Sequence, residues 1–388
     1  MNRFCSIFSQ LLQLFPRLEF QELVRETKAE RHARGFACWT QFVSMLFCQL
    51  GRAHSLREIC GGLASCEGKL SHLGIRSPKR STLAYANEHR PWQLYEQVFH
   101  RLLARCRTLT VGRRRKPFRF KNPLVSLDAT VIDLCASLFD WAQFQRTKGA
   151  VKLHLLLDHD GYLPTFACIT EGKASDLSVA RTLHFPPGTI VVFDRGFNDY
   201  DWFAELIDRH VFFVTRLKDD ANVGVLETRS LPPGSAILSD EIIRLHGLTH
   251  RGKPGYRFRR VEIEDPVQGR LVFLTNHLRL AATTIAAIYR DRWQIELFFK
   301  ALKQNLKVKT FVGVTPNALK TQIWTALIAM LILRFLQLKS AYDWSLSNLA
   351  ALLRMNLFVH RDLWSWLNEP FESPPELPEA AQPVLPFL

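Results

Sequence analysis

The sequence predicts an α/β fold in which a mixed five-stranded sheet is flanked by helices, preceded by an all-α N-terminal domain and interrupted by a β-rich insertion. Two observations support this prediction. Apolar residues recur at helical spacing through residues 1–105, whereas short β-branched and aliphatic runs replace them after Asn122. With 388 residues, 47% of them hydrophobic, the chain can bury a sizeable core and form more than one domain.

Helices are expected throughout the N-terminal region. Apolar residues keep a helical spacing over 39–50, and another helix is expected after Pro91. Two shorter segments, 55–63 and 81–90, lie between them, and the second is rich in Lys, Arg, Ser, Thr, Asn and His. This arrangement fits a DNA-binding helix-turn-helix, and it fits an ordinary helical bundle with a solvated face nearly as well.

The charge balance favours a polyanionic partner. The chain has 51 Lys and Arg against 36 Asp and Glu, a net charge of +15. Ribosome-associated, membrane-surface and merely soluble basic proteins share such a balance. Residues 105–121 hold eight basic residues and no acidic one, so a basic linker over 106–122 is expected to follow a phosphate backbone, with Arg113, Arg114 and Arg115 as DNA contacts.

Composition also argues against several other classes of protein. The eight cysteines form no Cys-x-x-Cys pair, which argues against structural zinc. No secretory signal is recognisable at the start, and the apolar run 323–333 is too short to cross a bilayer, so we expect a cytoplasmic protein in which this run is a buried helix. Six prolines after Glu369 predict an extended or disordered tail over 361–388.

The central region is predicted to contain strands and helices in the order β-β-β-α-β-α-β. A hairpin followed by alternating helices and strands is the pattern of an RNase H-like core. The strands are expected at 124–134, 150–158, 163–170, 189–193 and 211–215, and the helices at 176–183 and 200–209. Residues 217–280 become strand-rich and turn-rich again, which indicates an insertion before a helix begins near residue 281.

Two aspartates interrupt apolar strands of this core. Asp128 follows three apolar or small residues within the first strand, and Asp194 ends the run 190–193. A carboxylate there needs a cation or hydrogen bonds, and open α/β sheets place their sites at the carboxyl ends of strands, so the two aspartates are candidate ligands of a shared metal. For either one alone, a strand-end cap or a salt-bridged core residue is the simpler interpretation. Asp133 points to the opposite face from Asp128.

A third carboxylate lies on the helix expected over 282–306. Tyr289, Arg292, Glu296 and Lys303 fall on one stripe of that helix, since they are separated by three, four and seven residues. Glu296 would supply a metal ligand, the two cations would hold phosphate oxygens, and Tyr289 would hydrogen-bond or stack. The alternative is a solvated face on which Glu296 forms ion pairs with Arg292 and Lys300.

The pattern Tyr-x2-Arg-x3-Glu-x6-Lys resembles the YREK signature of insertion-sequence DDE transposases. Asp-Ala-Thr at 128–130, Phe-Asp-Arg-Gly-Phe at 193–197 and the sequence around Glu296 are similar to that family, and the resemblance covers about 122–340. It implies an RNase H-like fold with a β-rich insertion, and two Mg²⁺ or Mn²⁺ ions held by Asp128, Asp194 and Glu296. It also implies a homodimer that brings two transposon ends together on double-stranded DNA.

The resemblance adds expected DNA contacts and one difference. Tyr289, Arg292, Lys300, Lys303 and Arg195 are the expected DNA contacts of the catalytic region. Some members of the family stack a tryptophan from the insertion on a flipped base, but residues 217–280 contain no tryptophan, so hairpin formation does not follow from the resemblance. Tyr256, Phe258 and Phe273 are the aromatic alternatives.

These expectations define a domain order and a function. The expected segments are a helical DNA-binding domain (1–105), a basic linker (106–122), the first part of the catalytic core (123–216), the insertion (217–280), the second part of the core (281–360) and the tail (361–388). The expected activity is cleavage of inverted-repeat ends and joining of the 3′-OH to target DNA, in the cytoplasm at the bacterial nucleoid. A nuclease that stops after hydrolysis and a catalytically silent DNA-binding derivative are the alternatives.

Overall fold

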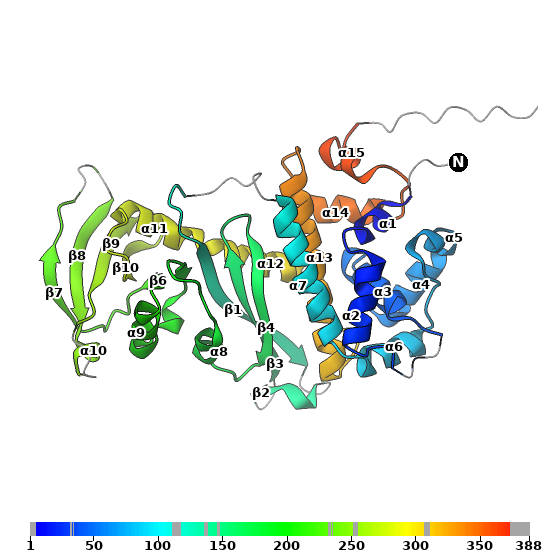
Figure 1. The fold of residues 1–388 in the computed structure, drawn as a ribbon, viewed down its shortest axis with the longest axis horizontal. Helices are drawn as coiled ribbons and strands as arrows, with labels where there is room; N and C mark the ends of the chain where they lie inside the picture. The colour runs from blue at the N-terminus through cyan, green and yellow to red at the C-terminus, as the bar shows by residue number, and fades with distance from the viewer. Residues whose placement is uncertain are drawn as a thin grey trace, which may run out of the picture.

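The computed structural model describes residues 5–31, 33, 35–110, 118–135, 139–145, 148–231, 234, 236–250, 255–305 and 311–372. Helices from both ends of the chain lie at one end of the molecule, the strands of residues 217–280 lie at the other, and the central sheet lies between them (Figure 1). The candidate catalytic residues all belong to this central part.

The N-terminal region is helical, as predicted. The helix predicted over 39–50 is present as α3 and ends before Gly51, and Ser55 caps α4 by accepting a hydrogen bond from the Glu58 amide. The elements are α1 (Ile7–Leu12), α2 (Arg17–Glu26), α3 (Cys38–Leu50), α4 (Leu56–Ser65), α5 (Glu67–Leu70), η1 (Ser71–Leu73), α6 (Arg80–His89) and α7 (Gln93–Thr110).

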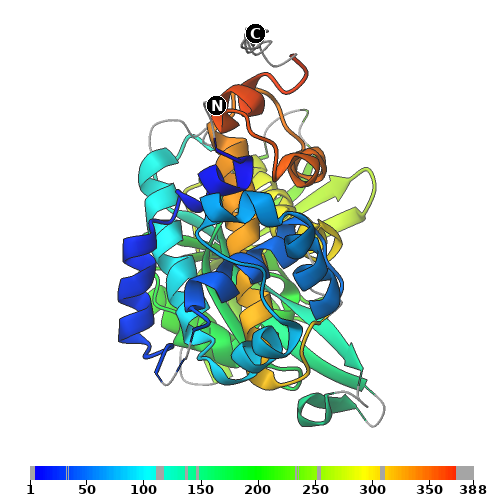
Figure 2. The ribbon, with the colours of Figure 1, turned by 90° about the vertical axis from the view of Figure 1, so that its right-hand side faces the viewer.

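Helix α13 (Pro316–Lys339) runs through the middle of these N-terminal helices (Figure 2). It packs against α3, α6 and α7 on one side and against β4 (Leu163–Glu171) and α12 (Trp293–Asn305) on the other. It is long and apolar enough to cross a membrane, but 83% of its most apolar window is buried inside the protein, in agreement with the predicted buried helix. One hydrophobic core therefore joins the N-terminal helices to one face of the central sheet.

The C-terminal end differs in part from the predicted tail. Two further helices follow α13, namely α14 (Leu346–Asn356) and α15 (Leu363–Asn368). Asp362 caps α15, and the helix buries Leu363, Trp366 and Leu367. The first residues assigned to the tail are therefore helical rather than extended. The rest of the predicted tail, 373–388, lies outside the described residues.

The central sheet has the predicted order of strands and helices, with one short additional strand, β2, between the first two predicted strands. β1 pairs antiparallel with β3 and parallel with β5, β3 pairs antiparallel with β4, and β5 pairs parallel with β6, so the sheet is mixed. The elements are β1 (Leu124–Cys135), η2 (Asp140–Ala142), β2 (Gln143–Gln145), β3 (Lys148–Asp158), β4, α8 (Asp176–Thr182), β5 (Ile190–Val192), η3 (Arg195–Phe197), α9 (Tyr200–Asp208) and β6 (Phe212–Arg216). The predicted mixed α/β class, with a helical N-terminal region, is confirmed.

The number of strands was predicted wrongly, because the sheet formed by the described residues has ten strands rather than five. The strands of the insertion continue the same sheet: β10 pairs antiparallel with β6, with Leu274 opposite Thr215. Without β10, the backbone groups along that edge of β6 would be unpaired. The insertion contains β7 (Val223–Thr228), β8 (Ile237–Leu245), α10 (His246–His250), β9 (Phe258–Asp265) and β10 (Gly269–Thr275).

The predicted helix over 282–306 consists of two helices, α11 (Ala282–Asp291) and α12, which meet at Arg292. The Arg292 amide donates to the carbonyls of both Ile288 and Tyr289, and the Ile295 amide donates to the Arg292 carbonyl. Two of these hydrogen bonds join residues that are three rather than four apart in the sequence, and such bonds tighten the helix at this position. The junction therefore coincides with a candidate site residue.

The two faces of the sheet follow the alternation of its residues. Val125 and Leu127 of β1 pack with Trp202 and Phe203 of α9 in one core. Leu124 of β1, together with β5 residues of the same parity, packs with α11 in another core. Since side chains alternate along a strand, the even-numbered residues of β1 face α11 and the start of α12.

Candidate active site

The parallel pairing of β1 with β5 brings Asp128 and Asp194 level with each other. Ser126 pairs with Val192, and continuing this register by two residues aligns Asp128 with Asp194. Both residues have the parity that faces α11 and α12. Asp194 follows the carboxyl end of β5 and caps η3, with its Oδ1 accepting from the Gly196 amide at 2.9 Å. Asp128 thus lies on β1, and Asp194 lies just beyond the end of the neighbouring strand β5.

Arg292 connects Asp128 to Glu296. Its Nη1 donates to Asp128 Oδ2 at 3.3 Å, and its Nη2 donates to Glu296 Oε1 at 2.5 Å. The i,i+4 ion pair of the alternative interpretation is therefore present between Arg292 and Glu296. However, Arg292 is only 9% exposed and reaches a carboxylate on another element, so this stripe of the helix is not a solvated face.

Asp194 and Glu296 act electrostatically on Asp128. Burial raises the pKa of Asp128 to about 6, and the negative charges of Asp194 and Glu296 act in the same direction, against the opposing effects of the Ala129 amide and the Arg292 guanidinium. The site therefore holds more negative charge than Arg292 alone compensates. A group of carboxylate oxygens with excess negative charge has the donor chemistry that Mg²⁺ and Mn²⁺ require.

The carboxylates do not surround a common point in this arrangement. Within the part of the chain that the structure describes, no three His, Cys, Asp or Glu side chains are close enough together to hold a metal ion as placed. Instead, two of the predicted ligands bind the Arg292 guanidinium. The donor set nevertheless fits a divalent cation chemically, because carboxylate oxygens are the ligands that such ions prefer.

The other predicted contacts of this region have different surroundings. The Arg292 guanidinium lies over the Tyr289 ring, 5.4 Å from its centroid, and the Phe273 ring lies 5.0 Å from Tyr289 on the insertion side. Lys303 Nζ donates to Thr130 Oγ1 at 2.6 Å and to the Val131 carbonyl at 2.7 Å, so it binds β1.

The remaining predicted DNA contacts are surface residues or lie outside the described part of the chain. Lys300 is exposed on α12. The Arg195 side chain is 56% exposed and pairs with Asp219 at 3.5 Å. Arg113, Arg114 and Arg115 lie outside the described residues.

Sequence reasoning missed a buried polar network beside this site. His159 Nδ1 donates to Asp291 Oδ2 at 2.5 Å, and its Nε2 shares a hydrogen bond of 2.6 Å with Ser126 Oγ. The Tyr162 hydroxyl also donates to the Asp291 carboxylate. Ser126 lies two residues before Asp128, and Asp291 directly precedes Arg292. The only sequence signal was a histidine in the turn that follows Asp158, a turn interpreted solely as a hairpin connection.

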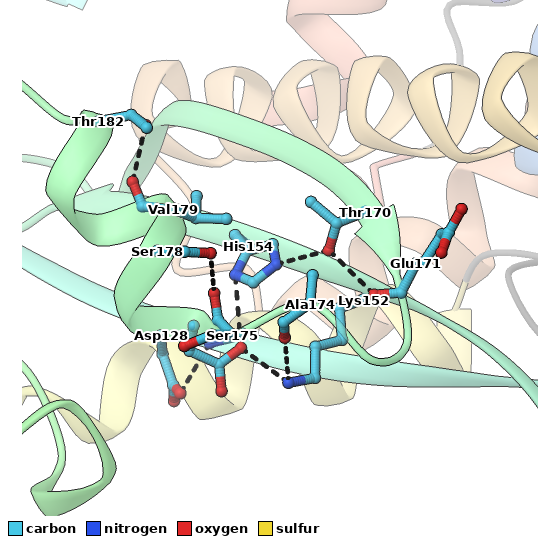
Figure 3. Close-up of polar contacts among 12 residues, drawn as sticks. Asp128, Lys152, His154, Thr170, Glu171, Ala174, Ser175, Ser178, Val179 and Thr182 are labelled. Carbon is cyan, nitrogen blue, oxygen red and sulfur yellow. Dashed lines mark hydrogen bonds and ion pairs between the residues drawn. The ribbon is translucent and has the colours of Figure 1, made fainter. Parts of the chain in front are cut away.

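A second polar cluster lies around β3 and α8 (Figure 3). Lys152 Nζ donates to the Ala174 carbonyl at 2.9 Å and to Asp176 Oδ1 at 3.0 Å. His154 Nε2 shares a hydrogen bond of 2.8 Å with Thr170 Oγ1, and its Nδ1 lies 3.6 Å from Asp176 Oδ1. Burial lowers the pKa of His154. These contacts fasten the segment before α8 to the central strands.

Comparison with known families accounts for the central region. The family model described as "Transposase DDE domain" matches residues 119–332, more than half of the chain. The chain belongs to this transposase family. DDE transposases generally use divalent metal ions, and the matched region of this transposase contains Asp128, Asp194 and Glu296. A second model, "Domain of unknown function (DUF4372)", matches residues 5–76, which include α1 to η1 and end before α6.

Curated relatives of the transposase support the same family. It is 29% identical over 312 residues to "Putative transposase y4zB" of Sinorhizobium fredii, covering 79% of this chain and 85% of that protein. It is also 29% identical over 273 residues to "Probable transposase for insertion sequence element IS5377" of Geobacillus stearothermophilus, covering 69% and 70% of the two chains. A solved piggyBac transposase synaptic complex with hairpin DNA matches with a TM-score of 0.47 and 10% identity, over 97% of this chain and 84% of that one.

Proposed function

We propose that this DNA transposase binds the inverted-repeat ends of an insertion sequence, cleaves them by metal-dependent phosphodiester hydrolysis, and joins the 3′-OH to target DNA. The observation that supports this proposal is that one buried arginine pairs with both Asp128 of β1 and Glu296 of α12, while Asp194, just past the end of the adjacent strand β5, acts electrostatically on Asp128. Asp128, Asp194 and Glu296 are the proposed catalytic residues and the proposed ligands of two Mg²⁺ or Mn²⁺ ions. When bound, such ions activate water and stabilise the leaving 3′ oxygen.

Arg292, which pairs with two of the three carboxylates, has its own role in the proposed function. Its guanidinium now compensates part of the charge of Asp128 and Glu296. Asp128 and Glu296 are the side chains that would hold a divalent cation, and the Arg292 guanidinium beside them would bind a phosphate oxygen of DNA. The adjacent Tyr289 ring, on which Arg292 rests, keeps the guanidinium beside the carboxylates. Arg292 thus holds the site together before DNA binds and holds the scissile phosphate afterwards.

The remaining DNA contacts and the assembly belong to the same proposal. Lys300 and Arg195 are proposed to bind the DNA backbone from the surface around the carboxylates, and Arg113, Arg114 and Arg115 from the basic linker. Tyr289 and Lys303 complete the proposed contacts, and Lys303 also fixes α12 to β1 through its two hydrogen bonds. Because two ends react together, the proposed complex on DNA is a homodimer.

The test is Mg²⁺-dependent cleavage and joining of labelled duplexes that carry the terminal repeats flanking the gene. Glu296→Gln keeps the size of the side chain and an acceptor for Arg292 but removes the negative charge. We expect it to bind the ends normally and to lose cleavage and joining by at least about 100-fold, by analogy with the loss of other charged catalytic groups. Glu171→Gln, at an exposed residue of β4, is the matched control and should keep full activity.

Each other result has a definite meaning. Cleavage without joining in the wild type would identify a nuclease that stops after hydrolysis. Binding without cleavage would identify a silent DNA-binding derivative. Normal activity of Glu296→Gln would contradict the proposed catalytic role of Glu296.

A further inference from the structure

Residues of helix α6 line two hollows on the surface of the helical end, so the helix forms a ridge between them. The hollow on one side has a volume of about 720 Å³, and Thr82 is the α6 residue that lines it together with Arg76 and Lys79. The hollow on the other side has a volume of about 570 Å³, and Ser81 and Ala84 line it. Because the surface is hollow on both sides of α6, this helix protrudes and has the shape needed to enter a groove on a partner.

The flanks of this ridge carry cations that the protein does not neutralise. Arg76 and Lys79 line the first hollow, and Arg57 and Arg80 line the second. All four are exposed, and no carboxylate of the described residues lies within ion-pair distance of them. Arginines of the neighbouring α7 differ, since Arg101 lies within ion-pair distance of both Glu22 and Glu26. The positive charge beside α6 is therefore available to a polyanion.

The outward face of α6 carries side chains suited to contact with bases. Ser81, Tyr85 and His89 follow one another at intervals of four residues, so they lie along one face of the helix. Tyr85 is 65% exposed, and the His89 ring stacks on its ring with centroids 3.9 Å apart. Large aromatic side chains that remain exposed to solvent on a helix are a common feature of binding surfaces.

The opposite face holds α6 rigidly in place. Leu83, Ala86 and Asn87 are buried, and α6 packs against α3, α4 and α13. Gln41 Nε2 donates to Asn87 Oδ1 at 2.9 Å, and Asn317 Nδ2 donates to the carbonyls of Asn87 and Arg90 at the end of the helix. The outward side chains are thus presented on a fixed element, which reduces the entropy lost when a partner binds.

We propose that α6 lies in the major groove of the terminal repeats of the element and reads their sequence. The major groove, about 12 Å wide, admits one α-helix, and cations on both flanks of the helix reach the phosphates of the two strands that border the groove. Ser81 and Tyr85 then contact base edges. This proposal rests on the proposed function, because only a protein that acts at specific ends requires such a reading surface. Cations alone would bind any DNA, whereas the exposed face of α6 provides discrimination.

The experiment measures binding of the full chain to the terminal-repeat duplex and to a scrambled duplex of equal length, in EDTA and over a series of salt concentrations. Arg76→Gln and Lys79→Gln should weaken binding to both duplexes, and each should lower the slope of log Kd against log salt by about 0.9, because one phosphate fewer is neutralised. Tyr85→Ala should lower the preference for the repeat about ten-fold and leave binding to the scrambled duplex unchanged. Arg101→Gln, at a cation already paired, and Met355→Ala, at a side chain 76% exposed on α14, are the matched controls.

The outcomes separate this proposal from the proposed function. Normal binding and normal preference in the Arg76, Lys79 and Tyr85 variants, with a wild type that prefers the repeat, would overturn the assignment of α6 and leave the proposed function intact. An equal loss on both duplexes in Tyr85→Ala would show that α6 contacts DNA without reading it, which overturns the commitment to the ends. A wild type with no preference for the repeat would contradict the proposed function itself.

Discussion

Replacing His159 by alanine should destabilise the protein strongly, because His159 is 1% exposed and both of its ring nitrogens are bonded. The hydrogen bond to the Asp291 carboxylate contributes about 1.5 to 3 kcal/mol and the one to Ser126 about 1 kcal/mol. Removing a buried ring leaves a cavity that costs roughly 1 to 2 kcal/mol more. We therefore expect the free energy of unfolding to fall by about 4 kcal/mol.

The measurement is urea unfolding of His159→Ala, Asp291→Ala and the double variant. The direct bond between the two residues predicts that their effects are not additive, with a coupling energy of about 1.5 kcal/mol or more. Ser126→Ala removes only one end of the network and should cost about 1 kcal/mol. Additive effects of His159→Ala and Asp291→Ala, within about 0.5 kcal/mol, would refute the reasoning that this network is a unit.

Two further predictions concern other buried polar groups. Asn317→Ala removes the acceptor of the Trp92 amide and the donor to the carbonyls of Asn87 and Arg90, so the free energy of unfolding should fall by about 2 to 3 kcal/mol. Asn317→Asp places a carboxylate oxygen against these two carbonyls and should be at least as destabilising as alanine in the same urea titration. Burial lowers the pKa of His154 in the folded state, so its contribution to stability is present above the unfolded pKa of about 6.5 and is lost as the pH falls below it. As the pH falls through this range, the free energy of unfolding measured in urea should fall less steeply in His154→Asn than in the wild type. A pH profile equal to that of the wild type would contradict this prediction.

The elements that depend on local patterns were predictable from the sequence. The helical spacing over 39–50 and the stop at Gly51 define α3, and the aliphatic run before Asp194 defines β5. The positions of Asp128 and Asp194 at corresponding points of two strands follow from the same patterns. Glu296 could be added because its spacing from Arg292 and Lys303 is visible in the sequence.

The features that depend on distant pairing were not predictable in this way. The ten-stranded sheet arises because β10 pairs with β6, and nothing in either strand alone specifies that partner. The network of Ser126, His159 and Asp291 joins three segments that are far apart in the sequence. The burial of Arg292 was also hidden, since an arginine four residues before a glutamate is the usual pattern of an exposed helix.

The central position of α13 affects the order in which the protein folds during its synthesis. A ribosome releases the N-terminal helices and the sheet before α13, yet the apolar side chains of both pack against α13 in the finished molecule. Neither part can cover these side chains until residue 339 has left the ribosome. A chain interrupted before that point would expose this apolar surface to water and aggregate. A shortened product of the same gene that keeps only the N-terminal helices would lack α13, against which α3, α6 and α7 pack.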